Sequence, residues 1–153
     1  MSSEKILNLI GGKLAEPRSG RYLECFEPAT GKAYSRVPDS DAEDVADAVA
    51  AAGAAFPTWS RTPADERARL LRRIGAKIEE RREDLARAES IDTGKPVSLA
   101  LGVDILRSRQ NFEFFADAAT QFASESHAMG SQAVNYTLRP PIGVVACISP
   151  WNL

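Results

Sequence analysis

The run from Ile142 to Ser149, "IGVVACIS", constrains the fold more than any other stretch of the sequence. Its residues are nearly all apolar, which is typical of a strand buried on both faces of a parallel sheet. Such a strand needs neighbouring strands and covering helices. The remainder of the 153 residues contains no further βα repeat and no glycine-rich phosphate loop. We therefore expect an α/β fold that this sequence enters but does not complete.

Short strands and turns are predicted in residues 6–37. Gly11-Gly12 follows an apolar run and marks a tight turn. Residues 21–37 then alternate in polarity. They are interrupted by Pro28-Ala29-Thr30-Gly31, a turn sequence with glycine where positive φ is easiest. This pattern predicts an antiparallel β-hairpin.

Three helices are predicted to follow. The first begins at Ser40, whose spacing to Glu43 is that of a capping box, and it ends at Phe56-Pro57. The second begins with Thr62 as N-cap and proline at the first helical position, and Gly94 is expected to end it as a left-handed cap. The charged side of this helix favours a solvated face over a binding patch; it comprises Lys77, Arg81, Arg82 and Glu83.

The third helix is predicted from about Val97 to Ser124. Its apolar residues recur on one side, which favours core packing over contact with a cofactor; they are Leu101, Ile105, Phe112, Phe115, Ala119 and Phe122. Apolar and polar residues alternate in residues 134–139, which predicts a strand with one solvent-exposed face. Pro140-Pro141 is expected to end this strand.

Charge and cysteine content exclude several functions. The chain has 19 basic and 21 acidic residues, a net charge of −2, so nothing points to nucleic acid. No stretch has the apolar length needed to cross a bilayer, and the N-terminus lacks the pattern of a signal peptide. Cys25 and Cys147 stand far apart, which indicates reduced thiols rather than a disulfide. We expect a cytoplasmic protein that binds neither nucleic acid nor membrane.

Four motifs in register resemble the aldehyde dehydrogenase superfamily. "RPPIGVVACISPWNL" is similar to the family's Pro-x-Gly-Val strand followed by a Pro-Trp-Asn turn. "FEPATG" and "FPTW" are similar to its Pro-x-Thr-Gly turn and its Phe-x-x-Trp, and "DTGKP" to its Gly-Lys-Pro signal. The resemblance covers the chain from about Leu7 onward. Within the superfamily, "DILRSRQNFEFFA" and "ISPWNL" most resemble the 2-aminomuconate and 2-hydroxymuconate semialdehyde dehydrogenases.

This resemblance implies an incomplete N-terminal portion of the aldehyde dehydrogenase fold, with a β-hairpin, three helices, arm strands and a first Rossmann-like strand. Residues 1–126 would be the N-terminal part of the NAD-binding domain. Residues 127–141 would form the strands of an oligomerisation arm, and residues 142–153 the first strand and turn of the dinucleotide-binding core. Because the arm pairs with a neighbouring subunit in the family, the resemblance also implies a homo-oligomer.

The resemblance assigns roles to residues near the end of the sequence. Asn152 would form part of the oxyanion hole, where an amide N–H stabilises the negative charge that develops on the aldehyde oxygen. Ile148, Ser149, Pro150 and Trp151 would line the nicotinamide-nucleotide site. From the residues alone, Asn152 is a turn residue bonding its own backbone, and Trp151 is equally well explained as core.

Other polar residues receive weaker assignments. Asp104, with the backbone of Cys25 and Phe26, matches positions that bind a monovalent cation in some relatives; a plain helix-surface carboxylate is the alternative. Cys147 is expected to be an inert thiol, because Ala146 and Ile148 flank it in a buried strand and no cationic neighbour lowers its pKa. In the family, the nucleophilic cysteine follows Pro-Trp-Asn far downstream. His127 is expected in a turn, without a Ser, Cys or acid partner, and receives no catalytic role.

The function implied is oxidation of an aldehyde, a muconate-type semialdehyde, to its carboxylate with NAD, in the catabolism of aromatic compounds. NADP stays open, as do the exact aldehyde and the oligomeric state. The family's catalytic cysteine, general-base glutamate and glycine-rich turn all follow Pro-Trp-Asn, so we expect this chain to be inactive alone. The alternative is a non-catalytic interaction or oligomerisation module.

Overall fold

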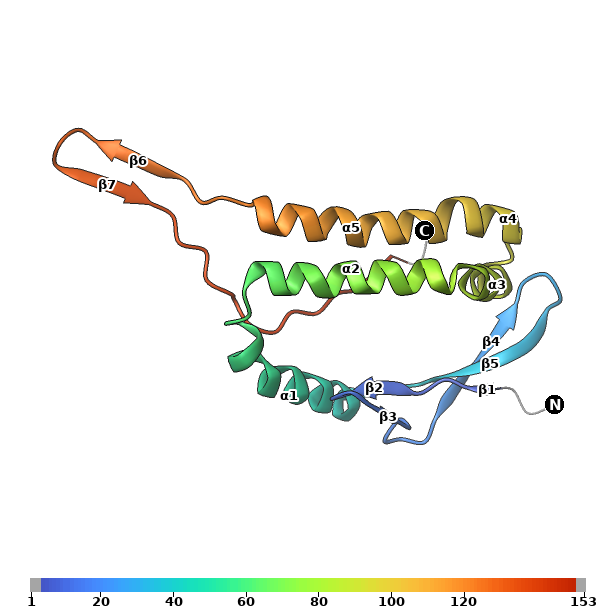
Figure 1. Ribbon diagram of the computed structural model, residues 1–153. Coiled ribbons are helices and arrows are strands. Elements are labelled where there is room, and N and C mark those ends of the chain that lie inside the picture. Colours follow the sequence, from blue (N-terminus) through green and yellow to red (C-terminus); the bar gives the residue numbers. More distant parts are fainter. Residues whose placement is uncertain (1–3, 151–153) are drawn as a thin grey trace.

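The computed structural model describes residues 4–150. In chain order it shows a set of short strands, three long helical segments and a protruding hairpin (Figure 1). Helices α2 and α5 lie side by side, and α1 lies near the strands β2 and β3 (Figure 1). Within the described residues, no helix combines the length and the apolar character that crossing a membrane requires.

The strands form two small sheets in the first 38 residues. Strand β4 pairs antiparallel with β5, β1 adds to β5 in parallel, and β2 pairs with β3. The bounds are β1 Glu4–Lys5, β2 Asn8–Ile10, β3 Lys13–Ala15, β4 Tyr22–Glu27 and β5 Lys32–Pro38. Both predicted turns are confirmed. The amides of Thr30 and Gly31 bond to the carbonyl of Glu27, and Gly31 takes a φ of 67°.

Helix α1 spans Ala42–Trp59, and both of its predicted ends are wrong. Its N-cap is Asp41, which forms the capping box with Asp44; the hydroxyl of Ser40 instead bonds to Asn8. Pro57 lies inside the helix. A proline in the last turn removes one hydrogen bond, the one that the carbonyl four residues earlier would accept. That residue, Gly53, is exposed, so water can replace the lost donor.

The second predicted helix is two helices, α2 (Ala64–Glu80) and α3 (Arg82–Thr93), with a break at Arg81. The N-cap of α2 is Pro63 rather than Thr62, because the Thr62 hydroxyl donates back to the carbonyl of Thr58. Helix α2 packs along α5 (Figure 1). The buried residues of α2, Ala68 and Gly75, are both small. A Cβ on Gly75 would lie 3.4 Å from the Glu113 side chain of α5, so the two helices approach closely there.

The end of α3 is held against the β4–β5 turn. Gly94 is the left-handed cap that the sequence predicts, with a φ of 76°, and its amide bonds to the carbonyl of Ser90. A Cβ at this position would stand 3.1 Å from the Cβ of Pro28. Beside it, the Tyr34 hydroxyl of β5 donates to the Asp92 carboxylate at 2.6 Å. The cap and this hydrogen bond together join the sheet to the helices.

The third predicted helix is confirmed in position but is not uniform. It comprises α4 (Val97–Leu99), a π-helical segment η1 (Ala100–Ile105) and α5 (Leu106–Gln121), so it ends three residues earlier than predicted. The prediction that the apolar residues of this helix pack in the core is wrong for two of them. Phe115 is 60% exposed and Phe122 is 71% exposed.

Strands β6 (Ser126–Met129) and β7 (Ala133–Tyr136) form a hairpin that projects away from the helices (Figure 1). The strand predicted from the alternation in residues 134–139 is confirmed only for residues 134–136, and the predicted distinction between a covered and a solvent-exposed face is wrong, because every residue of β7 is exposed. The turn expected at His127 is wrong, because this residue pairs with Asn135 inside the hairpin. The Glu125 carboxylate lies 3.9 Å from His127 Nε2, so an acidic neighbour is also present; both side chains are exposed.

Residues 137–150 contain no regular secondary structure. The buried strand predicted for residues 142–149 is therefore wrong in this structure: Ile142 is 91% exposed, Ile148 is 90% exposed, and Cys147 is exposed rather than buried. The physical reason is the absence, within the described residues, of a neighbouring strand to which this segment pairs. An isolated apolar strand gains no ladder hydrogen bonds.

The core of the described part is small. Its fully buried apolar residues are four alanines, Ala68, Ala86, Ala100 and Ala116, one each from α2, α3, η1 and α5. The accessible surface is 11790 Å². A compact monomer of this mass exposes about 7,600 Å². Much apolar surface is thus left uncovered, although the helices meet closely.

We expect Gly94→Ala to lower the free energy of unfolding, because the left-handed backbone costs a non-glycine residue about 1–2 kcal/mol and the new Cβ would press on Pro28. The measurement is urea titration of the helical circular dichroism signal. Gly12→Ala is the matched control, since Gly12 has a similar φ of 77° with open space around it. Equal losses for both variants would show that the Pro28 contact contributes nothing.

We expect Tyr34 to ionise at higher pH than an ordinary tyrosine. Its hydrogen bond to Asp92 is the largest cause of a pKa raised above the usual 10.0. Because the pKa of Tyr34 is higher in the folded chain than in the unfolded chain, the hydrogen bond to Asp92 stabilises the fold fully below about pH 10. This contribution to the free energy of unfolding is lost as the pH rises through the pKa of Tyr34 in the folded chain. Ultraviolet titration of the phenolate, with Tyr34→Phe to assign the signal, measures the pKa. Asp92→Asn should lower it, while Asp39→Asn should leave it unchanged; a Tyr34 pKa insensitive to Asp92→Asn would contradict this account.

Candidate functional site

The predicted cofactor wall lies in the irregular segment after β7. Ile148, Ser149 and Pro150 are all exposed, with no pocket formed around them in the described residues. Trp151 and Asn152 lie outside the described residues. The structure therefore describes three of the four residues predicted to line the nicotinamide site, and it tests neither that role nor the oxyanion role of Asn152.

Asp104 lies in the π-helical segment and is paired with a lysine. Its Oδ2 atom is 2.8 Å from Lys95 Nζ, which is also 2.9 Å from Glu89 Oε1. The hydrogen bonds to Asp104 and then to Glu89 raise the pKa of Lys95. These side chains are largely sheltered, with 18% exposure for Asp104 and 21% for Lys95. The cation held at Asp104 in this structure is thus the ammonium of Lys95.

This arrangement gives the Gly-Lys-Pro motif a structural role that the sequence reading missed. Gly94 turns the chain back, and the Ser90 hydroxyl donates to the carbonyl of Lys95 at 2.6 Å. The turned-back backbone aims the lysine between one carboxylate of α3 and one of η1. The sequence did contain a signal for these ion pairs: a lysine lies between glycine and proline, and acidic residues lie on the helices before and after it. Within residues 4–150, no cluster of three His, Cys, Asp or Glu side chains could hold a metal ion.

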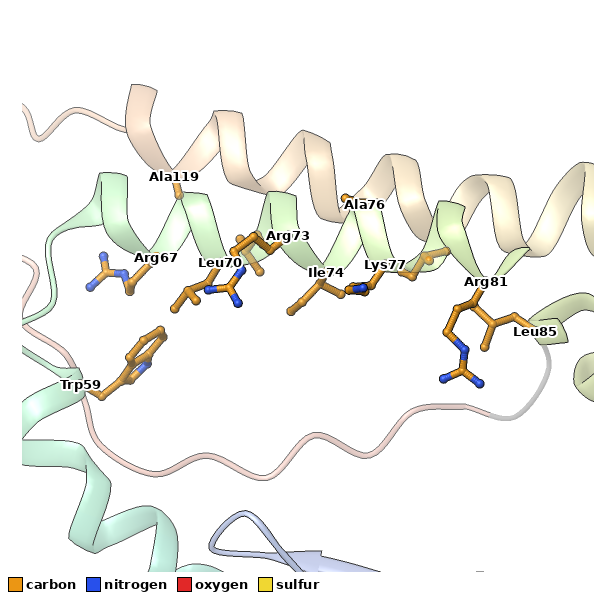
Figure 2. Close-up of a pocket in the computed structure, with 12 residues that line it drawn as sticks. Trp59, Arg67, Leu70, Arg73, Ile74, Ala76, Lys77, Arg81, Leu85 and Ala119 are labelled. Carbon is orange, nitrogen blue, oxygen red and sulfur yellow. The ribbon is translucent and has the colours of Figure 1, made fainter. Parts of the chain in front are cut away.

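An open groove of about 880 Å³ runs along α2, as shown in Figure 2. Apolar side chains from the end of α1, from α2 and from α3 line it, among them Trp59, Leu70, Ile74 and Leu85. Basic side chains also line it; they are Arg67, Arg73, Lys77 and Arg81. The sequence reading placed Lys77 and Arg81 on a solvated face, and the groove between them and the apolar row was not foreseen.

Comparison with known proteins identifies relatives of this chain. Residues 15–153 match the sequence model described as "Aldehyde dehydrogenase family". The 2-aminomuconic semialdehyde dehydrogenase of Bos taurus is 44% identical over 147 residues, which are 95% of this chain and 30% of that protein. The 2-hydroxymuconic semialdehyde dehydrogenase of Pseudomonas sp. (strain CF600) is 41% identical over 155 residues, covering 98% of this chain and 32% of that protein.

Solved structures agree with these relatives. The aldehyde dehydrogenase from Bacillus cereus, solved as an NAD+ complex, matches with a TM-score of 0.83 and 32% identity, over 87% of this chain and 28% of that chain. PnpE, solved in complex with nicotinamide adenine dinucleotide, matches with a TM-score of 0.81 and 33% identity, over 89% of this chain and 27% of that one. The chain spans about a third of the length of the curated relatives it matches.

These matches confirm the family and fold that the motifs indicated. The similarity to 2-aminomuconic and 2-hydroxymuconic semialdehyde dehydrogenases, read from the motifs, is confirmed as well. The α/β architecture corresponds to an N-terminal portion of the solved aldehyde dehydrogenases. Because the family model matches nine-tenths of its length, this chain belongs to the aldehyde dehydrogenase family.

Proposed function

We propose that this chain forms the N-terminal portion of an enzyme that oxidises a muconate-type semialdehyde to its carboxylate with NAD. The observation that carries the proposal is the identity of 41–44% to two muconic semialdehyde dehydrogenases over 95% or more of this chain. The solved relatives with bound NAD support the choice of cofactor. We further propose a homo-oligomeric, cytoplasmic protein, with NADP not distinguished from NAD.

The residues present fit one wall of a nicotinamide site. Ile148 offers an exposed apolar side chain, and Ser149 a hydroxyl, before the rigid Pro150. A flat ring needs an apolar face to rest on and few polar groups to orient it. NAD, when bound, would accept the hydride that leaves the substrate carbon. The role of this chain would be to hold the ring in place and to exclude water from it.

Asn152 is proposed to donate its side-chain N–H to the aldehyde oxygen. When a nucleophile adds to an aldehyde, the carbonyl bond opens and the oxygen becomes negatively charged. A fixed donor aimed at that oxygen stabilises the transition state by about 3 kcal/mol. For Asp104, a bound monovalent cation would compete with the ammonium of Lys95, which already contacts its carboxylate at 2.8 Å.

We expect the 153-residue chain to form no NADH with muconate semialdehydes, because a donor without a nucleophile and a base gives no reaction. Joined to the downstream two-thirds of the Pseudomonas relative, it should become active. In that fusion Asn152→Ala should lower kcat by about 10²–10³-fold, whereas Asn111→Ala, on the exposed side of α5, should not. Turnover by the chain alone at about 1 s⁻¹ or faster would overturn the proposed inactivity.

The projecting hairpin favours a second role in subunit association. Every residue of β6 and β7 is exposed, and the hairpin pairs with no other strand in the described residues. An unpaired strand edge presents free N–H and C=O groups that recruit another strand. This observation supports an oligomerisation module, whether or not the chain takes part in catalysis.

We expect the chain to co-elute with the full-length Pseudomonas relative in size-exclusion chromatography. Val134→Pro should abolish co-elution, because proline removes a backbone donor and disfavours the strand. Val134→Thr keeps a β-branched side chain and should preserve it. Separate elution of the wild-type chain would count against the arm as an association device.

A further inference from the structure

The π-helical segment η1 is an uncommon feature, and a lysine from outside the segment contacts it. A π-helical turn, called the wide turn below, holds one residue more than an α-turn and is frequent at functional sites. The Asp104 carboxylate of η1 contacts Lys95 Nζ at 2.8 Å, and both side chains are largely sheltered from solvent. The ion pair therefore ties the wide turn to the reversal of the chain that precedes it.

This ion pair depends on the wide turn. If residues 97–106 were α-helical throughout, each place after the turn would be taken by the residue before it. Val103 would then move toward Lys95, and Asp104 would turn away from it. An interaction that is made in only one of two conformations favours that conformation by its own free energy. The ammonium of Lys95 therefore selects the wide turn over a plain α-helix.

The packing of α5 on α2 fits only the register that the wide turn gives. Ala116 of α5 is fully buried, and the Glu113 side chain lies 3.4 Å from where a Cβ on Gly75 would stand. In a plain α-helix, Phe115 would take the place of Ala116. Phe112 would likewise take the place of Glu113. With two aromatic rings between the helices, α5 could not stay this close to α2.

The other end of α5 carries the β6–β7 hairpin (Figure 1). Residues 122–125 separate α5 from β6, and the chain after β7 is tied to them. The Arg139 guanidinium lies 5.2 Å from the centre of the Phe122 ring, and its Nη1 donates to the Ser124 hydroxyl at 3.4 Å. Both ends of the hairpin therefore meet at the end of α5, so the direction of the hairpin follows this helix.

We propose that Lys95 is a positioning residue for the β6–β7 hairpin. Its ion pair with Asp104 selects the wide turn, the wide turn sets the register of α5, and this register sets the direction in which the hairpin leaves. Helix α5 has 16 residues, so the effect is carried over about 24 Å along its axis. The inference rests on the proposed role of the hairpin in subunit association, because it names the residue that orients the hairpin for that role.

The test measures distances between two spin labels in the 153-residue chain, with Cys25→Ser and Cys147→Ser as the background. One pair of labels, at Glu66 of α2 and Gln110 of α5, reports the register of α5. A second pair, at Glu66 and Ala133 of β7, reports the direction of the hairpin. All three labelled positions are exposed. With Lys95 in place, each pair should give one narrow distance.

Lys95→Met should add a second Glu66–Gln110 distance, displaced by about 8 Å, because a rotation of about 100° carries a side chain that far around a helix about 10 Å wide. The Glu66–Ala133 distance should shift with it. Co-elution with the full-length Pseudomonas relative should weaken in proportion to the fraction of chains that shows the second distance.

Two controls accompany this variant. Lys95→Arg keeps the positive charge and should keep the original distances and the co-elution. Lys77→Met is the matched control, because it removes an ion pair of the same kind, with Glu80 on α2, that does not involve η1. It should leave both distances unchanged.

Lys95→Met leaves Glu89 and Asp104 without their shared cation, and such unpaired charges destabilise a fold strongly. A second variant therefore combines Lys95→Met with Glu89→Gln and Asp104→Asn, so that no member of the cluster stays charged. This triple variant should also show the second Glu66–Gln110 distance. Circular dichroism shows whether each variant retains its helices.

Three outcomes would overturn the proposal. Unchanged Glu66–Gln110 distances in both variants would show that the ion pair does not select the wide turn. A second Glu66–Gln110 distance with an unchanged Glu66–Ala133 distance would break the link from register to hairpin. Loss of the helical signal in both variants would make Lys95 a support of the whole fold rather than a positioning residue.

Failure of the proposed association gives a different result. In that case the wild-type chain elutes separately from the Pseudomonas relative, while Lys95→Met still shifts both label distances. The positioning role then stands without the association, so the two failures are distinguishable.

Discussion

The reversal of the chain at Gly94-Lys95 is the constraint on which the rest of this structure depends. The left-handed glycine ends α3 beside Pro28 in the β4–β5 turn, so the β4–β5 sheet meets α3 there. The next residue directs its ammonium to Glu89 and Asp104, which lie before and after the reversal. With the angle between α3 and η1 set in this way, α5 returns alongside α2.

Local chemistry made much of the fold predictable. Two glycine turns, the left-handed cap and the approximate positions of the helices could be read from turn residues and apolar spacing alone. The errors have local reasons too. Ser40 and Asp41 are both good caps, and the choice between them depends on Asn8, which is distant in sequence but bonds to Ser40. Burial of residues 142–149 was predicted from their apolar character and is wrong in this structure, because burial requires neighbouring strands that the described residues do not supply.

The candidate site also has parts that the sequence predicts and parts that depend on the tertiary structure. The roles of Asn152 and Trp151 came from resemblance, and they stay proposals because both residues lie outside the described part. Lys95 was present in a recognised motif, yet its ion pairs depend on a tertiary fold that no spacing rule reveals. The groove was missed for a different reason. The apolar stripe of α2 can be read from the sequence, but only the geometry shows that Leu70 and Ile74 of this stripe stay exposed and line a groove.

The π-helical segment Ala100–Ile105 has a further effect on α5. A single wide turn holds one residue more than an α-turn, and each α-helical residue advances the side chains by about 100°. Every position downstream is therefore rotated relative to a helix that runs without interruption from residue 97. Ala100 and Ala116 are both fully buried, although sixteen steps of about 100° would place them nearly opposite each other on an uninterrupted helix. Removing one residue from this segment would turn α5 about its own axis and present a different set of aromatic rings to its surroundings.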